Sequence, residues 1–300
     1  MVKEFKPIGQ AAIQAKGWIG AHKWLLLRRA SQLGVMLLFL LGPLSGIWII
    51  KGTLSSSLLL DTVPMTEPIV FLQMLVTGLV PALDAIIGFL IVAVFYLVVG
   101  GRVYCSWVCP VNLVTDAAHW LREKLNIRGG AHFNRNLRYW MLGMVLALSA
   151  IMETMAFEMF NPVSIIHRGI IFGVGMAWSV VIAIFLFDLL VAKRGWCSHL
   201  CPMGGLYSLI GHYSPIRVRA DNREACNDCM DCFVVCPEPQ VIKPVLKGAD
   251  KGIAPVILAG ECTNCGRCID VCSEDVFRFG PRFNHRVKAV CENRSAHQAG

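Results

Sequence analysis

Charged residues are scarce in this chain of 300 residues. Asp, Glu, Lys and Arg make up only 16% of the sequence, whereas hydrophobic residues make up 55% and the mean hydropathy is +0.57. An ordinary soluble protein is about one quarter charged. The composition therefore excludes a purely soluble enzyme and predicts a membrane protein that carries a soluble part.

The sequence also shows no cleavable secretion signal. Residues 1–23 are polar and basic and are interrupted by glycines, so they lack the apolar core of a signal peptide. Arg28-Arg29 precedes an apolar run, but the residues that follow do not continue a twin-arginine motif. We therefore expect residues 1–29 to form a cytoplasmic tail, with the arginine pair at the membrane edge.

Four stretches are apolar enough to cross a bilayer, which takes about 20 helical residues. These predicted spans are residues 33–50, 83–99, 139–157 and 170–192. A fifth stretch, residues 69–80, is shorter and is separated from the second span by Pro81. It is predicted to be an interfacial or re-entrant helix, or to merge with the second span.

Lysine and arginine residues fix the predicted orientation. Six precede the first span, six lie between the second and third spans, and fourteen follow the fourth span, whereas only Lys51 and Arg168 lie in the other two connections. Cytoplasmic loops carry the excess of positive charge. This pattern predicts a multi-pass protein of the bacterial inner membrane with both termini in the cytoplasm. It also explains the net charge of +8 without a nucleic-acid partner.

Cysteine is abundant, and eight of the thirteen cysteines form one spacing repeated twice. The two runs are Cys226-x2-Cys229-x2-Cys232-x3-Cys236-Pro237 and Cys262-x2-Cys265-x2-Cys268-x3-Cys272. This is the ligand run of two-cluster bacterial ferredoxins. A zinc site or a disulfide framework does not call for the third and fourth cysteines at these spacings. The runs therefore predict two 4Fe–4S clusters and one-electron chemistry.

A second cysteine motif occurs twice, after the second and the fourth predicted spans. Arg102-Val103-Tyr104-Cys105-Ser106-Trp107-Val108-Cys109-Pro110 aligns with Arg194-Gly195-Trp196-Cys197-Ser198-His199-Leu200-Cys201-Pro202. The membrane part is thus predicted to be a duplicated helical hairpin related by a pseudo-two-fold axis. Cys105, Cys109, Cys197 and Cys201 would then form a redox relay of dithiols or a shared metal or cluster site. Packing of helix ends is the alternative. Cys291 lies outside every motif and is predicted to be a plain thiol.

These features predict three parts and one fold class. Residues 1–29 are the tail, residues 30–215 an all-α membrane domain of four helices, and residues 216–300 a small cytoplasmic α+β ferredoxin-type domain. The paired motifs and the doubled ferredoxin run together resemble the NapH-type membrane ferredoxins, which are related to NosR and CcoG. We expect neither the flavin-binding domain that precedes the spans in NosR nor the additional C-terminal domain of CcoG.

The resemblance implies a quinol dehydrogenase subunit. Electrons from menaquinol or ubiquinol would pass, with an exported iron–sulfur partner of the NapG type, to a c-type cytochrome and a periplasmic nitrate reductase. The alternative is an assembly or maturation factor that reduces a metal or cofactor for a partner. Cross-ligation in such ferredoxins assigns the fourth cysteine of each run to the other cluster. The expected ligand sets are Cys226, Cys229, Cys232 and Cys272 for one cluster, and Cys262, Cys265, Cys268 and Cys236 for the other.

A quinol site needs acceptors for two protons and a hydrogen-bond donor to the quinol oxygens. Ionisable residues in or beside membrane spans are rare and are often functional. Among those on the predicted outer side, Glu153, Glu158 and His167 are the candidates for this role, with Asp84 behind them. A partly solvated loop carboxylate or a helix cap is the competing interpretation for each one.

Overall fold

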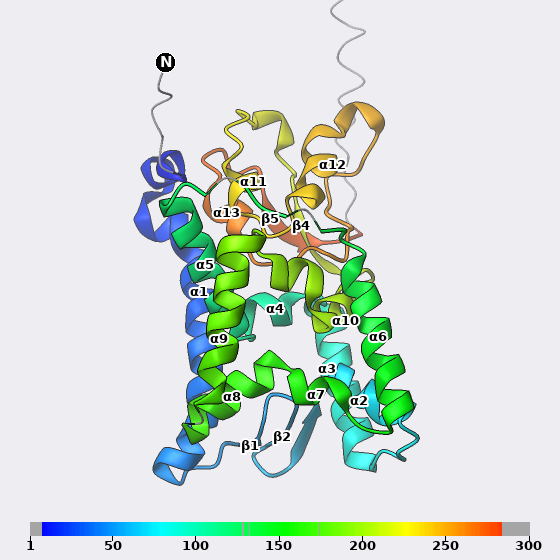
Figure 1. Cartoon of the computed structure of the whole chain (residues 1–300). Coiled ribbons are helices and arrows are strands. Elements are labelled where there is room, and N and C mark those ends of the chain that lie inside the picture. Colours follow the sequence, from blue (N-terminus) through cyan, green and yellow to red (C-terminus); the bar gives the residue numbers. More distant parts are fainter. Residues whose placement is uncertain (1–7, 128, 132, 174, 284–300) are drawn as a thin grey trace, which may run out of the picture.

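The computed structural model describes residues 8–283 except residues 128, 132 and 174. Long helices run between two ends of the molecule, and the segments after residue 216 form a cap on one end (Figure 1). Three short strands and the helices α2, α7 and α8 lie at the opposite end. Cys291 lies outside the described residues.

The long helices only partly match the predicted spans. They are α1 (Gln10–Ser45), α3 (Leu83–Val99), α6 (Leu137–Met152) and α9 (Met176–Leu186), the last continued by the π-helical turn η1 (Phe187–Val191). Only α3 has the predicted bounds. Among the described residues, α1 alone is both long and apolar enough to cross a membrane by length and composition, while α3, α6, α8 and residues 178–191 form shorter apolar helices.

The bounds of the other three predicted spans were wrong for local reasons. The first helix starts at Gln10, has a break at Gly17, where φ is 74°, and ends at Ser45, so Ile50 already belongs to a strand. The third helix ends at Met152 because Glu153 takes a left-handed φ of 50°. The fourth predicted span is divided at Gly173, which caps α8 with a φ of 67°.

A small sheet follows α1, so the expectation of an all-α membrane part was wrong. Strands β1 (Ile50–Gly52), β2 (Ser56–Leu59) and β3 (Val63–Thr66) are antiparallel in the order β1-β2-β3. Strand β3 packs closely on α3, where a side chain at Gly88 would approach the Thr66 nitrogen to 2.9 Å. Four- and three-residue strands carry too little alternation to be recognised from the sequence.

Two short helices begin in the same way at this end of the molecule. Helix α2 (Pro68–Val76) has a first-turn proline and is capped by the Glu67 side chain, which accepts from the Val70 nitrogen at 3.3 Å. Helix α8 (Pro162–Phe172) also begins with proline, and the Asn161 side chain accepts from the Val163 nitrogen at 3.1 Å. Proline and a side-chain acceptor are typical of helix starts. The predicted short helix before Pro81 is therefore present as α2. The five-residue helix α7 (Ala156–Phe160) precedes α8.

Each Cys-x3-Cys-Pro motif forms a short turn followed by a helix. The first motif gives α4 (Val103–Trp107) and α5 (Val111–Lys124), and the second gives η2 (Trp196–Leu200) and α10 (Pro202–Gly211). Tyr104, Cys109 and Tyr207 belong to one apolar core with residues of α2, α3, α6 and α8. The core thus joins both motifs.

The cap after residue 216 is a small α+β unit with its own core. Strands β4 (Ile216–Arg219) and β5 (Arg278–Pro281) pair antiparallel. Its helices and 3₁₀ turns are η3 (Arg223–Ala225), α11 (Asp231–Val235), η4 (Pro239–Val241), α12 (Ile242–Lys247), η5 (Ala249–Lys251) and α13 (Arg267–Asp270). Val218, Ile242, Ile257 and Phe277 are buried between them. This is the fold class expected for the ferredoxin-type part.

Candidate iron–sulfur centres and the membrane cysteine group

Four cysteines of the cap line one small cavity, which we call the distal cysteine group. Its members are Cys226, Cys229, Cys232 and Cys272. Asp228 and Met230 take left-handed φ values of 58° and 66°, so the chain curls around the cavity before α11 begins. Phe233, Val276 and Phe277 supply the apolar wall. Three residues of the first run and one of the second therefore meet at this place.

The other four cysteines of the cap line a second small cavity and form the proximal cysteine group. Its members are Cys236, Cys262, Cys265 and Cys268. Val218, Val241 and Ile257 close the cavity, and Cys265 and Cys268 are buried. The structure thus brings together the two sets of four that cross-ligation implies.

The thiol chemistry of both groups fits iron–sulfur clusters. All twelve cysteines within the described residues are free of disulfides. Burial raises the pKa of the Cys232 thiol to about 12, and nearby cysteines add to this rise. A ligand must be a thiolate, so binding of a cluster would displace protons from these groups. In the described part of the chain, no three His, Cys, Asp or Glu side chains are arranged to hold a single metal ion.

The second pair of motifs forms the membrane cysteine group, which comprises Cys105, Cys109, Cys197 and Cys201. All four belong to or pack against one apolar core. Cys105 and Cys197 line a small cavity together with Thr263 and Arg267 of the cap. Pro237, Thr263 and Arg267 line both this cavity and that of the proximal group, three of whose cysteines, Cys262, Cys265 and Cys268, belong to the same cap segment. The proximal group therefore adjoins the membrane group, which gives the two cap groups their names.

The serine of each membrane motif binds the cap. Ser106 donates its hydroxyl to the Thr263 carbonyl at 2.8 Å, and Ser198 donates to the Pro237 carbonyl at 3.3 Å. Thr263 belongs to the second ferredoxin run and Pro237 ends the first. Each repeat thus contacts the cap through its serine, a role that the repeated serine did not indicate in the sequence.

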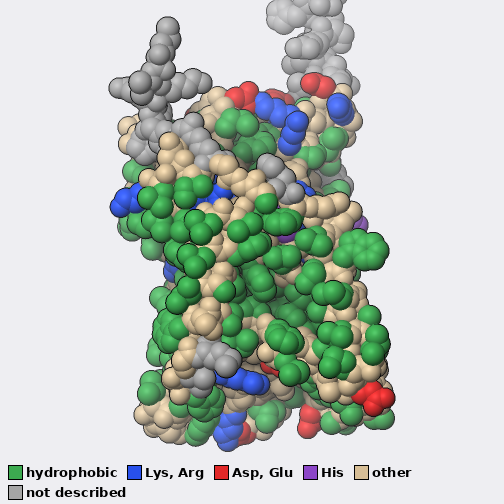
Figure 2. Space-filling model, in the orientation of Figure 1, with side chains coloured by type: hydrophobic (Ala, Val, Ile, Leu, Met, Phe, Trp, Pro, Cys, Tyr) green, Lys and Arg blue, Asp and Glu red, His purple; other side chains and the backbone are tan. Residues whose placement is uncertain are grey.

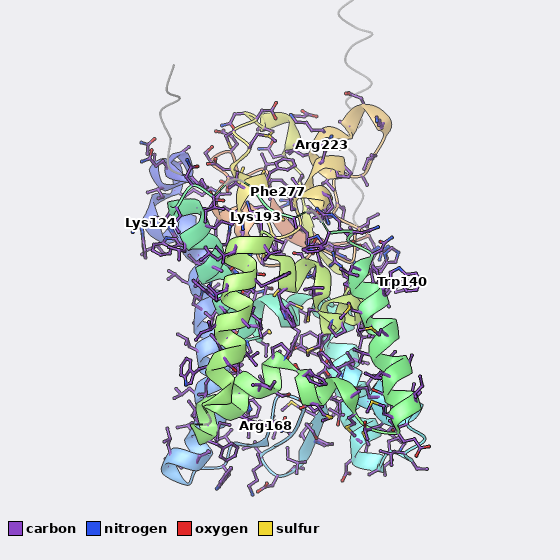
Figure 3. All side chains as sticks on the ribbon, in the orientation of Figure 1. Lys124, Trp140, Arg168, Lys193, Arg223 and Phe277 are labelled. Carbon is purple, nitrogen blue, oxygen red and sulfur yellow. The ribbon has the colours of Figure 1, made fainter. Side chains whose placement is uncertain are left out.

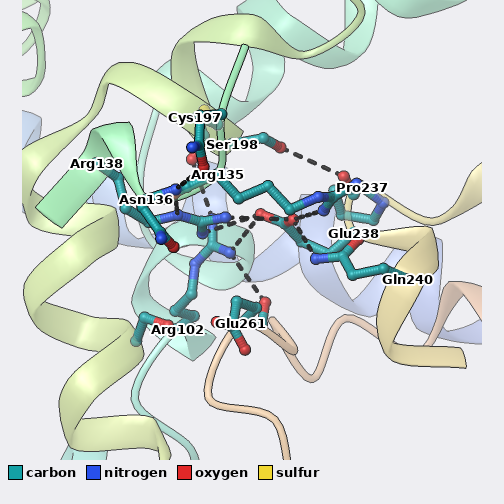
Figure 4. A network of polar contacts seen from close by, with 12 residues as sticks. Arg102, Arg135, Asn136, Arg138, Cys197, Ser198, Pro237, Glu238, Gln240 and Glu261 are labelled. Carbon is teal, nitrogen blue, oxygen red and sulfur yellow. Dashed lines mark hydrogen bonds and ion pairs between the residues drawn. The ribbon is translucent and has the colours of Figure 1, made fainter. Parts of the chain in front are cut away.

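A buried ion-pair network holds the first repeat against the cap (Figure 4). Glu238 accepts from Arg102 at 2.7 Å, from Arg138 at 3.0 Å and from Arg135 at 2.8 Å. Arg102 also donates to the Cys197 and Glu261 carbonyl oxygens at 3.0 and 2.9 Å. Burial alone would raise the pKa of Glu238, but Arg102 and Arg138 hold it below its usual value.

Arg194, which occupies the position of Arg102 in the second repeat, joins a different network. Its partner Asp116 on α5 also pairs with Arg29 and Arg267, and the three N–O distances are 2.8, 2.5 and 2.6 Å. Burial alone would raise the pKa of Asp116, but the three guanidinium groups lower it far below its usual range. The sequence had marked both arginines as part of the repeat without indicating these partners.

The candidate quinol residues lie in different surroundings. Glu158 accepts from Ser55 at 2.9 Å and from Asn161 at 3.1 Å. His167 is 1% exposed, lies against Phe39 of α1 at a ring distance of 4.7 Å, and has no hydrogen-bond partner for either ring nitrogen among the described residues. Glu153 is exposed at the end of α6, so the structure does not place it with the buried histidine.

Comparisons with known proteins match both cysteine systems. A family model described as a 4Fe-4S binding domain matches residues 81–128 and, again, residues 174–220, and each match contains one Cys-x3-Cys-Pro motif. A model described as a 4Fe-4S dicluster domain matches residues 225–276. No solved structure matches the chain.

Several curated relatives extend over nearly the whole chain. The ferredoxin-type protein NapH of Escherichia coli is 45% identical over 96% of this chain and 100% of its own length. The NapH protein of Haemophilus influenzae is 45% identical over 92% of this chain and 96% of its length. The methylamine utilization ferredoxin-type protein MauN of Methylorubrum extorquens is 48% identical over 90% of this chain and 93% of its length. The chain therefore belongs to the family of ferredoxin-type iron–sulfur electron-transfer proteins that includes NapH and MauN.

Proposed function

We propose that this protein is a multi-pass inner-membrane subunit that oxidises quinol and passes the electrons toward an exported iron–sulfur partner. Because that partner lies outside and the cap is proposed to lie in the cytoplasm, either the membrane cysteine group carries electrons across the bilayer or the cap serves a separate cytoplasmic input. The observation that carries the proposal is the stacking of three cysteine groups along one molecule. The membrane group lies between apolar helices, and the proximal and distal groups follow in the cap.

Four spans are proposed, formed by α1, α3, α6 and α9 with η1. Hydrophobic side chains cover the middle of the face shown in Figure 2, with charged side chains toward the two ends. Exposed large apolar residues on the three shorter helices include Leu90, Phe95, Met144, Ile151, Trp178 and Ile182. A helix of 17 residues such as α3 is about 25 Å long. A bilayer thins locally to match a helix of this length.

The proposed orientation places the cap and both termini in the cytoplasm. Lys124 and Lys193 lie toward the cap, whereas Arg168 lies toward the opposite end (Figure 3). This distribution supports the positive-inside orientation. The sheet β1–β3 and α8 would then face the outer side.

The proposed cofactors are two 4Fe–4S clusters, one in each cap group. They would supply one-electron transfer, and the eight cap cysteines would hold them. The membrane cysteine group is proposed to act as a dithiol relay or to bind a further metal or cluster. Its contact with Thr263 and Arg267 supports electron exchange with the proximal group.

The proposed quinol site lies at the outer ends of the helices. Glu158 would accept a proton, and His167, with both ring nitrogens unpartnered, would hydrogen-bond a quinol oxygen. Glu153 would serve only as an outer proton acceptor because it is exposed. Glu67 is a further candidate that the sequence analysis did not name, since it is 4% exposed and its Oε1 atom has no hydrogen-bond partner among the described residues.

The proposed acceptor chain is a NapG-like exported iron–sulfur protein, a c-type cytochrome and a periplasmic nitrate reductase. The similarity to MauN favours a second acceptor system, one that serves methylamine utilization. The two acceptor systems would require different partner proteins but the same electron-transfer chemistry in this chain. A maturation factor that reduces a cofactor for another protein is the remaining alternative.

The test is anaerobic purification with associated partners, followed by addition of a reduced quinol analogue and recording of the iron–sulfur EPR signals. Quinol should reduce the clusters of the wild type, and His167→Gln should slow this reduction while dithionite still reduces the clusters fully. Ser45→Ala, at an exposed site on α1, is the matched control and should behave as the wild type. Clusters that dithionite reduces but quinol does not would refute quinol oxidation and favour the maturation role.

A further inference from the structure

The two cap groups have opposite electrostatic surroundings. Three arginines approach the proximal group: Arg28 of α1 and Arg194 at the second repeat are buried, and Arg267 of the cap lines the proximal cavity itself. Asp116 is the carboxylate that pairs with Arg194 and Arg267, and it pairs with Arg29 as well. Three guanidinium groups therefore share one carboxylate, and Arg28 adds a fourth positive charge.

Arg28 differs from Arg194 and Arg267 because it forms no ion pair within the described residues. Its side chain is 1% exposed, and its Nε and Nη1 atoms have no hydrogen-bond partner there. It lines a cavity of about 560 Å³ together with Asp116, Arg194 and Arg267. A buried guanidinium with free donors is costly unless an anionic group lies nearby. Helix α1, which carries Arg28, packs against α13, which carries Cys268 of the proximal group, and the Trp24 and Leu25 nitrogens of α1 donate to the Asp270 carboxylate of α13.

The distal group has acidic and exposed surroundings instead. Cys229 is exposed, and the Asp228 carboxylate lies 3.5 Å from the Cys226 sulfur. Glu274 lines the same cavity. The Lys247 cation is paired with Asp228 at the surface. Water also screens charges at this site more strongly than at the buried proximal site.

We propose that Arg28, Arg194 and Arg267 hold the reduction potential of the proximal centre above that of the distal centre. The inference rests on the part of the proposed function that places one 4Fe–4S cluster in each cap group. Reduction adds one negative charge to a cluster, so buried cations favour the reduced form and nearby carboxylates oppose it. Arg28 is the residue whose charge is least compensated.

The order of the two reduction potentials determines which centre in the cap holds the first electron. A single electron delivered to the cap occupies the proximal centre, next to Cys105 and Cys197 of the membrane group. The distal centre fills second and is the one open to a soluble partner at Cys229. The arginines thus keep the first electron at the membrane side of the unit.

The experiment is a dithionite titration of the purified full-length protein, with the EPR signals recorded against the solution potential. Cys229→Ser removes a ligand of the distal cluster and identifies the remaining signal as proximal. In the wild type the proximal signal should appear at the higher potential. Arg28→Gln should shift the proximal signal to lower potential and leave the potential of the distal signal unchanged. Arg28→Lys keeps the positive charge, so its proximal potential should stay close to that of the wild type.

Asp228→Asn is the matched variant for the other group, and it should raise the potential of the distal signal only. If the proximal signal of the wild type appears at a lower potential than the distal signal, the proposal is overturned. This comparison uses the wild type and Cys229→Ser, so it can be made even if Arg28→Gln does not accumulate. An unchanged proximal potential in folded Arg28→Gln overturns the role of this residue. The titration uses no quinol, so a failure of quinol oxidation leaves this test unaffected. Iron analysis separately reports whether both clusters are present.

Discussion

Arg102 and Glu238 form an ion pair of 2.7 Å in which each side chain is only 1% exposed. Arg102 precedes the first membrane cysteine motif, and Glu238 follows the Cys236-Pro237 end of the first ferredoxin run. The pair therefore ties a membrane motif directly to the segment that carries a proximal cysteine. Arg102 also binds the Cys197 carbonyl of the other repeat, so one side chain connects both repeats and the cap.

Replacing Glu238 by Gln should loosen the cap. The change leaves Arg102 and Arg138 buried without their carboxylate, and breaking a buried pair in this way costs about 3–5 kcal/mol. Limited proteolysis of detergent-solubilised protein should cleave the variant near the junction at residues 212–216 more rapidly than the wild type. Glu261→Gln is the control because Arg102 binds only the backbone carbonyl of Glu261. Equal cleavage rates for Glu238→Gln and the wild type would show that the pair does not hold the cap.

The same pair predicts a pH dependence. The folded-state pKa of Glu238 lies below the usual value of 4.5 because Arg102 and Arg138 outweigh the effect of burial. A carboxyl with a lowered pKa stabilises the fold above its unfolded pKa, and this contribution is lost as the pH falls through the folded value. Protection from an acid-active protease should therefore persist from pH 7 to about pH 5 and fall at lower pH. In Glu238→Gln this acid-dependent step should be smaller.

The sequence predicted the features that have local signals and missed those that depend on long-range ion pairs. The spacing of the cysteine runs and the uninterrupted apolar run of α3 are local signals, so the cysteine motifs, the repeat and the bounds of α3 followed from the sequence. Residues 10–29 were read as a tail because they are polar. In the structure Lys16 pairs with Asp275 of the cap and Arg28 is buried near the proximal group, so this segment packs as a helix against the cap. Contacts between residues so distant in sequence leave no local pattern.

The proposed topology predicts the location of reporter fusions. Alkaline phosphatase fused after Gly52 or Asn161 should be active because these sites are expected on the outer side. Fusions after Lys124 and at the C-terminus should be inactive, and a fluorescent reporter at the same two sites should give the reverse pattern. Activity of phosphatase fused after Lys124 would contradict four spans with both termini inside.

Replacing Cys229 by Ser should remove one cluster and spare the other. Cys229 lines the distal cavity only, and serine is a poor ligand for iron compared with a thiolate. Iron and sulfide should each fall by the content of one cluster, with the proximal signal retained. The Cys265→Ser variant is the reciprocal control at the proximal group. Loss of all iron from Cys229→Ser would mean that the two clusters assemble only together.

The membrane cysteine group gives the sharpest test of the electron route. Cys105→Ser or Cys197→Ser should abolish quinol-dependent reduction of the partner while the protein remains in the membrane, since each thiol would be part of the relay. Loss of a merely structural thiol would instead cost about 1 kcal/mol of stability and leave the activity near normal. Ser106→Ala is the neighbouring control because it removes the hydrogen bond to Thr263 without touching a thiol.

Iron content separates the two forms of the relay. A fall in iron together with activity indicates a bound metal or cluster, whereas unchanged iron with lost activity indicates a dithiol couple. Wild-type rates in all four serine variants, Cys105→Ser, Cys109→Ser, Cys197→Ser and Cys201→Ser, would remove the membrane group from the electron route.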